Sequence, residues 1–241
     1  MRVAVLSDIH ANLVALDAVI ASLGSVDAVW HLGDVVGYGP EPDGVVERLR
    51  QLGARGVRGN HDAAALGGPE IAYFNPDARR AMEWTRTTIS AVTRDWLAAL
   101  PERFTDGAFT AVHGSPREPI WEYVTSASVA AENLAAFETP YCLHGHTHVP
   151  VVFRERAEGR LDALRPEGDA RLELGPARAL VNPGSVGQPR DGDPRASYLV
   201  LDTEPATAEW RRVAYRIADT QAAMREAGLP HFLVARLEVG V

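Results

Sequence analysis

The sequence predicts one α/β domain in which two β-sheets are flanked by outer helices. Residues 1–62 alternate β-branched apolar runs with amphipathic segments, in the order strand, helix, strand, helix, strand. Repeated βα units of this kind form a parallel sheet with right-handed crossovers. Beyond residue 148 the chain is rich in short strand-like runs separated by Gly, Pro and Asp turns. No linker rich in Pro, Gly or Ser divides the chain, so we expect a single domain over residues 1–241.

The first part of the chain carries a strand signal three times. RVAVLSD at residues 2–8, VDAVWHLGD at 26–34 and ARGVRGNHD at 54–62 are apolar runs that end in polar residues, which is typical of buried strands. Asn12 is a good N-cap for a helix with Leu and Val on one face. Residues 39–53 combine a loop containing Gly and Pro with a second helix. These segments give the parallel part of the fold.

The middle of the chain is mainly helical, and the remainder is mainly β-structure. Helical spacing of apolar residues predicts helices at 75–90, 93–100, about 126–137 and 219–228. Strand patterns occur at 109–116, 141–148, 150–155, 160–164, 170–174, 178–185, 196–202 and 207–215.

Composition and charge narrow the functional classes. The formal net charge is −8, and all 24 basic residues are arginine because the sequence has no lysine. Charge alone therefore argues against binding to duplex nucleic acid. The single cysteine, Cys142, excludes an intrachain disulfide and is expected to be a small buried hydrophobe. Polar residues such as Asp8 and Asp17 interrupt the apolar N-terminus, so we expect no signal peptide, no membrane association and a cytoplasmic protein.

Five predicted strands end in side chains that can bind a metal or move a proton. They are Asp8 and His10, then Asp34, then Asn60, His61 and Asp62, then His113, and finally His146 and His148. Ligands of open α/β sheets bind at the carboxyl ends of the strands, so these side chains should converge on one cleft. Carboxylate, imidazole and amide groups suit Mn, Fe, Co, Ni or Zn. Seven candidate ligands exceed the needs of one metal, whereas two metals sharing a carboxylate would use them all.

Three histidines, His144, His146 and His148, occupy alternate positions in the run CLHGHTH. On a β-strand this spacing would point all three side chains to the same face. Buried imidazoles need partners for both ring nitrogens. A bound metal would supply such partners, which gives the spacing a chemical reason.

The motifs DIH, GD, GNHD, a lone His and GHTH, in this order, resemble those of the calcineurin-like metallophosphoesterase family. The resemblance extends from Asp8 to about Arg190. The segment NPGSVGQPR is similar to the NPGS…PR segment of a small bacterial and archaeal phosphodiesterase-like branch. The resemblance implies a four-layer αββα sandwich of two mixed β-sheets flanked by helices, which agrees with the two sheets predicted above.

The resemblance also implies a role for each motif residue. One metal would be bound by Asp8, His10, Asp34 and His148, and the other by Asp34, Asn60, His113 and His146, with Asp34 as the bridge. His61 would be the general acid at the leaving group, oriented by Asp62. Two divalent ions about 3.5–4 Å apart can hold a bridging hydroxide that attacks the phosphorus. We expect two such ions, drawn from Mn, Fe, Ni, Co or Zn, with Mn favoured.

The candidate substrate-binding residues are Asn60, Arg117 and Arg190. The two arginines are included because arginine binds phosphate oxygens in a bidentate manner. Trp121 and Tyr123 could stack on a base or serve local packing. His31 and His144 are expected to be packed or hydrogen-bonded near the metal ligands rather than to be ligands. His231 is assigned no role.

The expected function is hydrolysis of a small phosphodiester or nucleotide. The run GDVVGYGP lacks the DRG sequence of the protein phosphatase branch, and GNHD replaces its usual GNHE. Alternatives of the same fold are a dinucleoside polyphosphate hydrolase and a phosphomonoesterase. A non-catalytic metal-bound scaffold or regulatory binding protein is a third option, although His61 and all seven ligands are present. The resemblance also admits a homo-oligomer.

Overall fold

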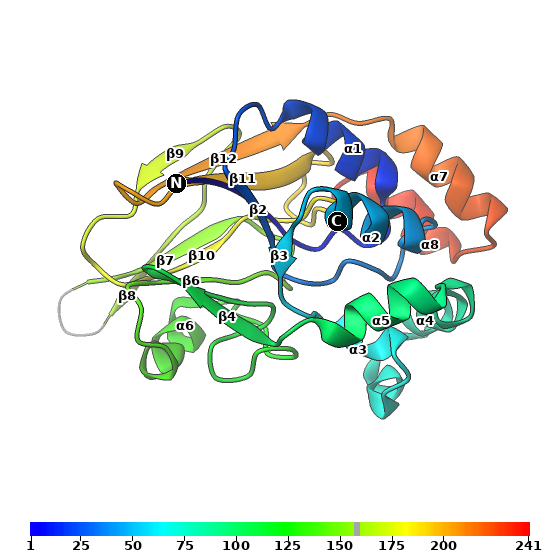
Figure 1. The fold of residues 1–241 in the computed structure, drawn as a ribbon, viewed down its shortest axis with the longest axis horizontal. Helices are drawn as coiled ribbons and strands as arrows, with labels where there is room; N and C mark the ends of the chain where they lie inside the picture. Colours follow the sequence, from blue (N-terminus) through cyan, green and yellow to red (C-terminus); the bar gives the residue numbers. More distant parts are fainter. Residues whose placement is uncertain (157–159) are drawn as a thin grey trace.

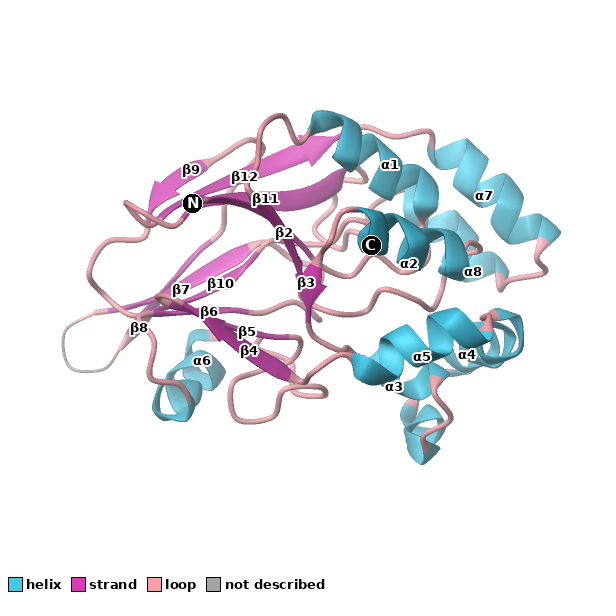
Figure 2. Cartoon of the chain, viewed as in Figure 1, coloured by secondary structure: helices cyan, strands magenta, loops and turns pink. Residues whose placement is uncertain are grey.

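The computed structural model describes residues 1–156 and 160–241. Two mixed β-sheets lie face to face in the centre of the molecule, and helices cover both outer faces (Figures 1 and 2). The predicted four-layer αββα arrangement is therefore confirmed. Within the described residues no helix is both long enough and apolar enough to cross a membrane.

The first sheet has the strand order β3-β2-β1-β11-β12-β9. Its strands are β1 (Arg2–Leu6), β2 (Ala28–His31), β3 (Arg55–Gly56), β9 (Arg171–Glu173), β11 (Ala196–Asp202) and β12 (Thr207–Val213). The three N-terminal strands are parallel, as predicted, because helices connect them. β11 then pairs antiparallel with β1, with Val3 opposite Leu201.

The second sheet has the strand order β4-β5-β6-β10-β7-β8. Its strands are β4 (Arg103–Asp106), β5 (Phe109–Val112), β6 (Tyr141–Leu143), β7 (Val151–Glu155), β8 (Leu161–Leu164) and β10 (Ala179–Asn182). β5, β6 and β10 are parallel, and antiparallel strands close both edges. The carboxyl ends of β5 and β6 therefore face the same end of the sandwich.

Helices form the two outer layers and one end of the molecule. They are α1 (Leu13–Ser22), α2 (Pro42–Gln51), α3 (Asn60–Ala65), α4 (Pro76–Thr88), α5 (Ala91–Ala99), α6 (Ala127–Asn133), α7 (Ile217–Glu226) and α8 (His231–Ala235), with 3-10 turns at Pro69–Tyr73, Leu134–Ala136 and Arg236–Glu238. Apolar side chains of α1 and α2 pack on the outer face of the first sheet. α6 packs on the outer face of the second sheet (Figure 1).

The core between the sheets is built from large apolar side chains of both. Trp30 and Leu199 of the first sheet pack with Leu143 of the second. Trp210 on β12 is also fully buried here, and its Nε1 donates a hydrogen bond of 3.0 Å to the carbonyl oxygen of Asn182 on β10. This bond joins the two sheets and satisfies a buried indole N–H, which would otherwise destabilise the core.

Several predicted strands end earlier than expected, and two of these differences concern residues of the candidate site. The third strand covers only Arg55–Gly56, because Asn60 begins α3. The run at 141–148 is a strand only as far as Leu143, so His144, His146 and His148 lie in a loop and do not share one strand face. The sequence reading also missed β4 and α8. β4 is a short edge strand that pairs with β5, so its sequence carries little pattern of its own.

Candidate metal centre

The candidate ligands lie in loops that follow β1, β2, β5 and β6, together with the first residue of α3. Five of them have positive φ angles: Asp8 (52°), His10 (50°), Asp34 (51°), His146 (67°) and His148 (61°). Non-glycine residues rarely adopt this conformation, and such strain is concentrated at functional sites. The surrounding structure holds these loops in conformations that turn the side chains inward.

One group of possible ligands consists of Asp8, His10, Asp34 and His148, which offer ligand atoms within 4.8 Å of one another. His10 Nε2 lies 3.6 Å from Asp34 Oδ2 and 3.1 Å from His148 Nε2. His148 Nε2 is in turn 3.3 Å from Asp8 Oδ1. All four residues are buried. They converge from segments that are far apart in the sequence, as the motif order predicts.

A second group consists of Asp34, His113 and His146. His113 Nε2 lies 3.4 Å from Asp34 Oδ2 and 3.0 Å from His146 Nδ1. Asn60 joins this group, because its Oδ1 is 3.0 Å from His113 Nε2. Asp34 is thus common to both groups, which is the arrangement expected of a bridging carboxylate.

Each of the four histidines uses its outer ring nitrogen to bond a backbone carbonyl oxygen. The pairs are His10 Nδ1 to Val36 (3.3 Å), His113 Nδ1 to Leu32 (2.8 Å), His146 Nε2 to Trp121 (3.2 Å) and His148 Nδ1 to Gln188 (2.6 Å). A carbonyl oxygen can only accept, so each outer nitrogen must carry the proton. The inner nitrogens then present lone pairs to one another at 3.0–3.1 Å, an arrangement that a cation stabilises. The donor set therefore fits divalent metal ions.

The pKa shifts of the candidate ligands also favour the binding of cations. Burial raises the pKa of Asp8 to about 7, and burial together with neighbouring Asp62 raises the pKa of Asp34. Burial and then the positive charge of neighbours lower the pKa values of His10 and His148. Neutral imidazoles and buried carboxylates are the forms that bind metal, and a cation would offset the cost of burying these carboxylates.

Two motif glycines allow the loops to approach closely. A Cβ atom on Gly59 would lie 2.2 Å from Asp34 Oδ1. A Cβ atom on Gly145 would lie 2.0 Å from Ser7 Oγ, which donates a 2.6 Å hydrogen bond to Asp8 Oδ2. The glycines of GNHD and GHTH therefore make room for the two buried carboxylates.

His61 lies beside the first group, with its ring centroid 4.8 Å from that of His10. Its ring Nδ1 is 3.1 Å from Met82 Sδ. Asp62 accepts hydrogen bonds from the backbone N–H groups of Gly59 (2.9 Å), Val35 (2.9 Å) and Val36 (3.1 Å). Its expected role in orienting the His61 ring stays a prediction. Since α3 begins at Asn60, Asp62 is a capping residue in its first turn, and it fixes the loop that carries Asp34.

Arg190 lies close to the cluster, whereas Arg117 does not join it. The Arg190 guanidinium bonds Gln188 Oε1 at 2.7 Å, and its charge lowers the pKa of His148. Arg117 is held at the surface by Glu122, which Arg117 Nε contacts at 2.9 Å, and by Glu132 at 2.6 Å. Both charged neighbours of Arg117 are thus acidic, and its expected role in substrate binding stays a prediction.

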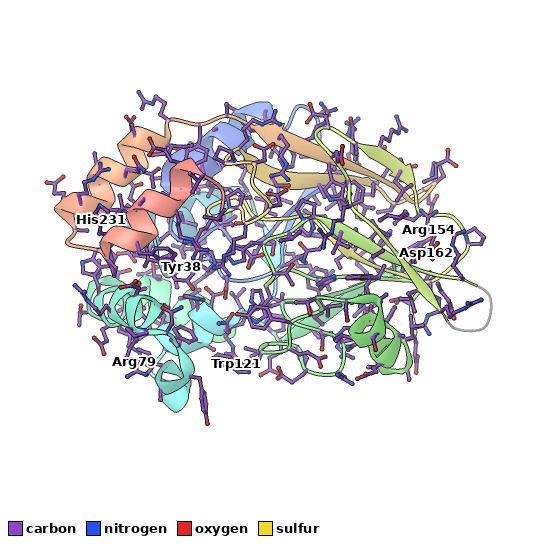
Figure 3. All side chains as sticks on the ribbon, turned by 180° about the vertical axis from the view of Figure 1, so that it is seen from behind. Tyr38, Arg79, Trp121, Arg154, Asp162 and His231 are labelled. Atoms are coloured by element: carbon purple, nitrogen blue, oxygen red, sulfur yellow. The ribbon has the colours of Figure 1, made fainter. Side chains whose placement is uncertain are left out.

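The sequence reading missed Tyr38 as a residue of the site. Its buried ring lies 4.6 Å from that of His10 and 4.3 Å from that of His61, and the Arg190 guanidinium is 5.8 Å from its centre. Tyr38 is also packed against the C-terminal helices (Figure 3). Its position in GDVVGYGP, four residues after Asp34, was the available signal.

The two aromatic candidates have different environments. Trp121 provides the carbonyl oxygen that bonds His146, and its ring packs 6.1 Å from that of Phe74 (Figure 3). Tyr123 stacks on His146 with ring centres 3.6 Å apart. Both therefore support the His146 imidazole.

The remaining candidates are buried side chains outside the two ligand groups. His31 packs on Trp96, with ring centres 5.4 Å apart. His144 Nδ1 is 3.4 Å from the amide nitrogen of Asn182, which also bonds the carbonyl oxygen of Gly145. Cys142 is a free, buried thiol in the core beneath α6, as expected.

Comparison with known proteins agrees with this geometry. A metallophosphoesterase crystal structure from Sphaerobacter thermophilus is 50% identical and covers 100% of both chains, with a TM-score of 0.92. A Pyrococcus horikoshii protein that is 20% identical shares the fold, with a TM-score of 0.81 over 100% of this chain and 98% of its own.

Two curated proteins also match. An uncharacterised protein of Methanocaldococcus jannaschii is 37% identical, over 99% of this chain and 98% of its own length. A symmetrical bis(5'-nucleosyl)-tetraphosphatase of Aromatoleum aromaticum is 31% identical over 124 residues, which are 49% of this chain and 44% of that protein. The family model of the calcineurin-like phosphoesterase superfamily domain matches residues 1–206. The chain therefore belongs to the calcineurin-like phosphoesterase superfamily.

Proposed function

We propose that this protein hydrolyses small phosphodiesters with two divalent cations bound by the seven residues of the candidate centre. The observation that supports it best is that two groups of inward-facing donors share Asp34. The outer hydrogen bonds of the histidines fix which nitrogen faces inward, so the donors are organised before any ion binds. We take Mn²⁺ as the first ion to test, with Fe, Co, Ni and Zn as alternatives.

Divalent ions at this centre would supply activation of a water molecule at neutral pH and neutralisation of phosphate oxygens. The side chains around them have separate tasks. The second ring nitrogen of His61 is the group that gives a proton to the leaving oxygen, since Nδ1 faces Met82. Arg190 binds a non-reacting phosphate oxygen. Asn60 would help to hold the second ion and would contact the substrate.

The preference for a diester follows from the charged groups near the centre. A phosphodiester carries one negative charge, whereas a monoester carries about 1.5 to 2 at neutral pH. Arg190 is the arginine beside the cluster, because Glu122 and Glu132 neutralise Arg117. With the divalent ions, Arg190 supplies enough positive charge for a singly charged phosphate.

A dinucleoside polyphosphate is a second candidate substrate. It is supported by the relative of Aromatoleum aromaticum, whose name describes a symmetrical bis(5'-nucleosyl)-tetraphosphatase. A phosphomonoester is a third candidate, and a metal-bound scaffold without activity is a fourth.

The test is hydrolysis of bis(para-nitrophenyl) phosphate and para-nitrophenyl phosphate by protein loaded with Mn²⁺. We expect turnover of both esters to require the metal, with higher kcat/KM for the diester. The His61→Ala variant should retain its metal but lose turnover. Preference for the monoester would contradict the diester assignment. Loaded protein without activity on either ester or on diadenosine tetraphosphate would favour the scaffold.

A further inference from the structure

A groove of about 290 Å³ is lined by Tyr123, which stacks on the candidate ligand His146, and by Thr147, which follows His146 in the chain. One wall is the segment Tyr123–Ala127, and the other walls are the residues after His146 and strands β7 and β8. α6 follows the first wall and lies against these strands on the outer face of the second sheet (Figure 1). The volume is close to the lower end of the range for small-molecule sites, about 300–1,000 Å³.

Two residues connect the groove to the metal centre. Thr147, which lies between the candidate ligands His146 and His148, lines its inner end. Tyr123 forms another part of that end and stacks on His146 at an interplanar angle of 24°. The Tyr123 side chain is still 49% exposed, so its second face is open to a ligand. Tyr123 therefore contacts the metal centre through His146 and the groove through its own exposed surface.

The lining of the groove selects for a ring system with little charge. Its floor is formed by Val124, Val151 and Phe153, which are almost completely buried. No aspartate or glutamate is among the described lining residues, and Arg165 stands exposed at its outer end. Apolar walls, an open tyrosine face and one arginine at the rim are suited to a planar heterocycle with hydrogen-bond acceptors on its edge.

We propose that this groove binds the nucleoside arm of a phosphodiester whose phosphate occupies the metal centre. The assignment rests on the proposed function and adds the identity of one ester group. The base stacks on the open face of Tyr123 above the apolar floor, and Arg165 donates to acceptors on the edge of the base. An acyl chain would leave Arg165 without a polar partner, and a peptide would need more room than 290 Å³.

The decisive variant is Ala163→Trp. Ala163 is an exposed residue of β8 that lines the groove, so a tryptophan there would fill the groove without changing the core. The matched control is Ala135→Trp. Ala135 is also an exposed alanine, and it lines a different groove, between Arg103 and Thr139, at the other end of the α6 segment. Neither residue is one of the candidate metal ligands.

Two substrates with the same leaving group separate the groove from the metal centre. They are the para-nitrophenyl ester of thymidine monophosphate and methyl para-nitrophenyl phosphate. We expect Ala163→Trp to lower kcat/KM for the thymidine ester about tenfold or more, mainly through KM, and to leave the methyl ester unchanged. The Ala135→Trp protein should resemble wild type with both substrates. An equal loss on both esters, or no loss on either, would overturn the proposal.

Calorimetric binding of thymidine monophosphate gives a readout that does not need turnover. Wild type and the Ala135→Trp control should bind it, and Ala163→Trp should bind it about tenfold more weakly or not at all. Equal binding by wild type and Ala163→Trp, or no binding by wild type, would refute the nucleoside site. Binding that depends on Ala163 in a protein that cleaves no ester would instead retain the groove assignment and reject the proposed function.

Discussion

His31 offers a test of the structure that is independent of the metal centre. The residue ends β2, its side chain is fully buried, and neither ring nitrogen has a hydrogen-bond partner among the described residues. Trp96 covers one side of the ring, and a Cβ atom on Gly56 would lie 2.1 Å from Nε2. Burial lowers the pKa of His31 from its usual 6.5 to about 3. The perturbation is His31→Leu, which removes the titrating group and keeps an apolar side chain of similar size.

The size of the effect follows from the two pKa values. At pH above 6.5 the imidazole is neutral in both the folded and the unfolded chain, so it adds no pH dependence. Below 6.5 the unfolded chain takes up a proton that the folded chain rejects, and stability falls until the pH reaches about 3. At about pH 4.5 the difference is about two pH units, or about 3 kcal/mol of unfolding free energy. The leucine variant should not suffer this loss.

Urea unfolding of the metal-free proteins at about pH 8 and about pH 4.5 measures the effect. At the higher pH we expect the leucine variant to match or exceed wild type, because two unpaired buried nitrogens have been removed. At the lower pH the stability advantage of the leucine variant should grow by about 3 kcal/mol. The control is His231→Gln, at the exposed first residue of α8, which should show no such growth. A constant difference between wild type and the leucine variant at both pH values would refute the buried, unpaired state of His31.

Three further substitutions test the site and the core. His61→Ala should lower kcat on a diester by about 10²–10⁴-fold and leave the metal content unchanged. Steady-state kinetics and elemental analysis measure these two quantities, and an unchanged kcat would exclude His61 as the proton donor. Gly145→Ala should reduce metal content and lower the free energy of unfolding by about 1–3 kcal/mol, because its new methyl group would collide with Ser7. A variant with full metal content and wild-type stability would contradict this close approach. Trp210→Phe should lower the free energy of unfolding, measured in urea, by about 1–3 kcal/mol, because the carbonyl oxygen of Asn182 loses its donor on the other sheet. A change near zero would show that this hydrogen bond is dispensable.

Much of the site was predictable because each motif follows a buried strand with a clear apolar pattern. Asp8 follows β1 and His113 follows β5, and strands that run parallel bring their carboxyl ends together. The order of the motifs then identified a family whose model matches residues 1–206. The expected fold class followed from the same strands. The extent of a single domain across residues 1–241 remains a prediction.

The parts that the sequence did not predict depend on local backbone geometry or on tertiary contacts. The alternate spacing of His144, His146 and His148 was interpreted as a strand, but β6 ends at Leu143 and the loop after it has positive φ angles at His146 and His148. Those angles are set by neighbouring loops, including the Asp8 carboxylate that accepts a hydrogen bond from the His146 N–H. The resemblance assigned Asp62 to His61, and it gave no sign that the position of Asp62 in the first turn of α3 also makes it an acceptor for backbone N–H groups.

The most direct test of the central claim is a crystal structure of the protein loaded with Mn²⁺, analysed by anomalous scattering. The account predicts two manganese peaks that share Asp34. One should also be bound by Asp8, His10 and His148, and the other by Asn60, His113 and His146. A single peak, two peaks that do not share Asp34, or no manganese at the cluster would contradict the account.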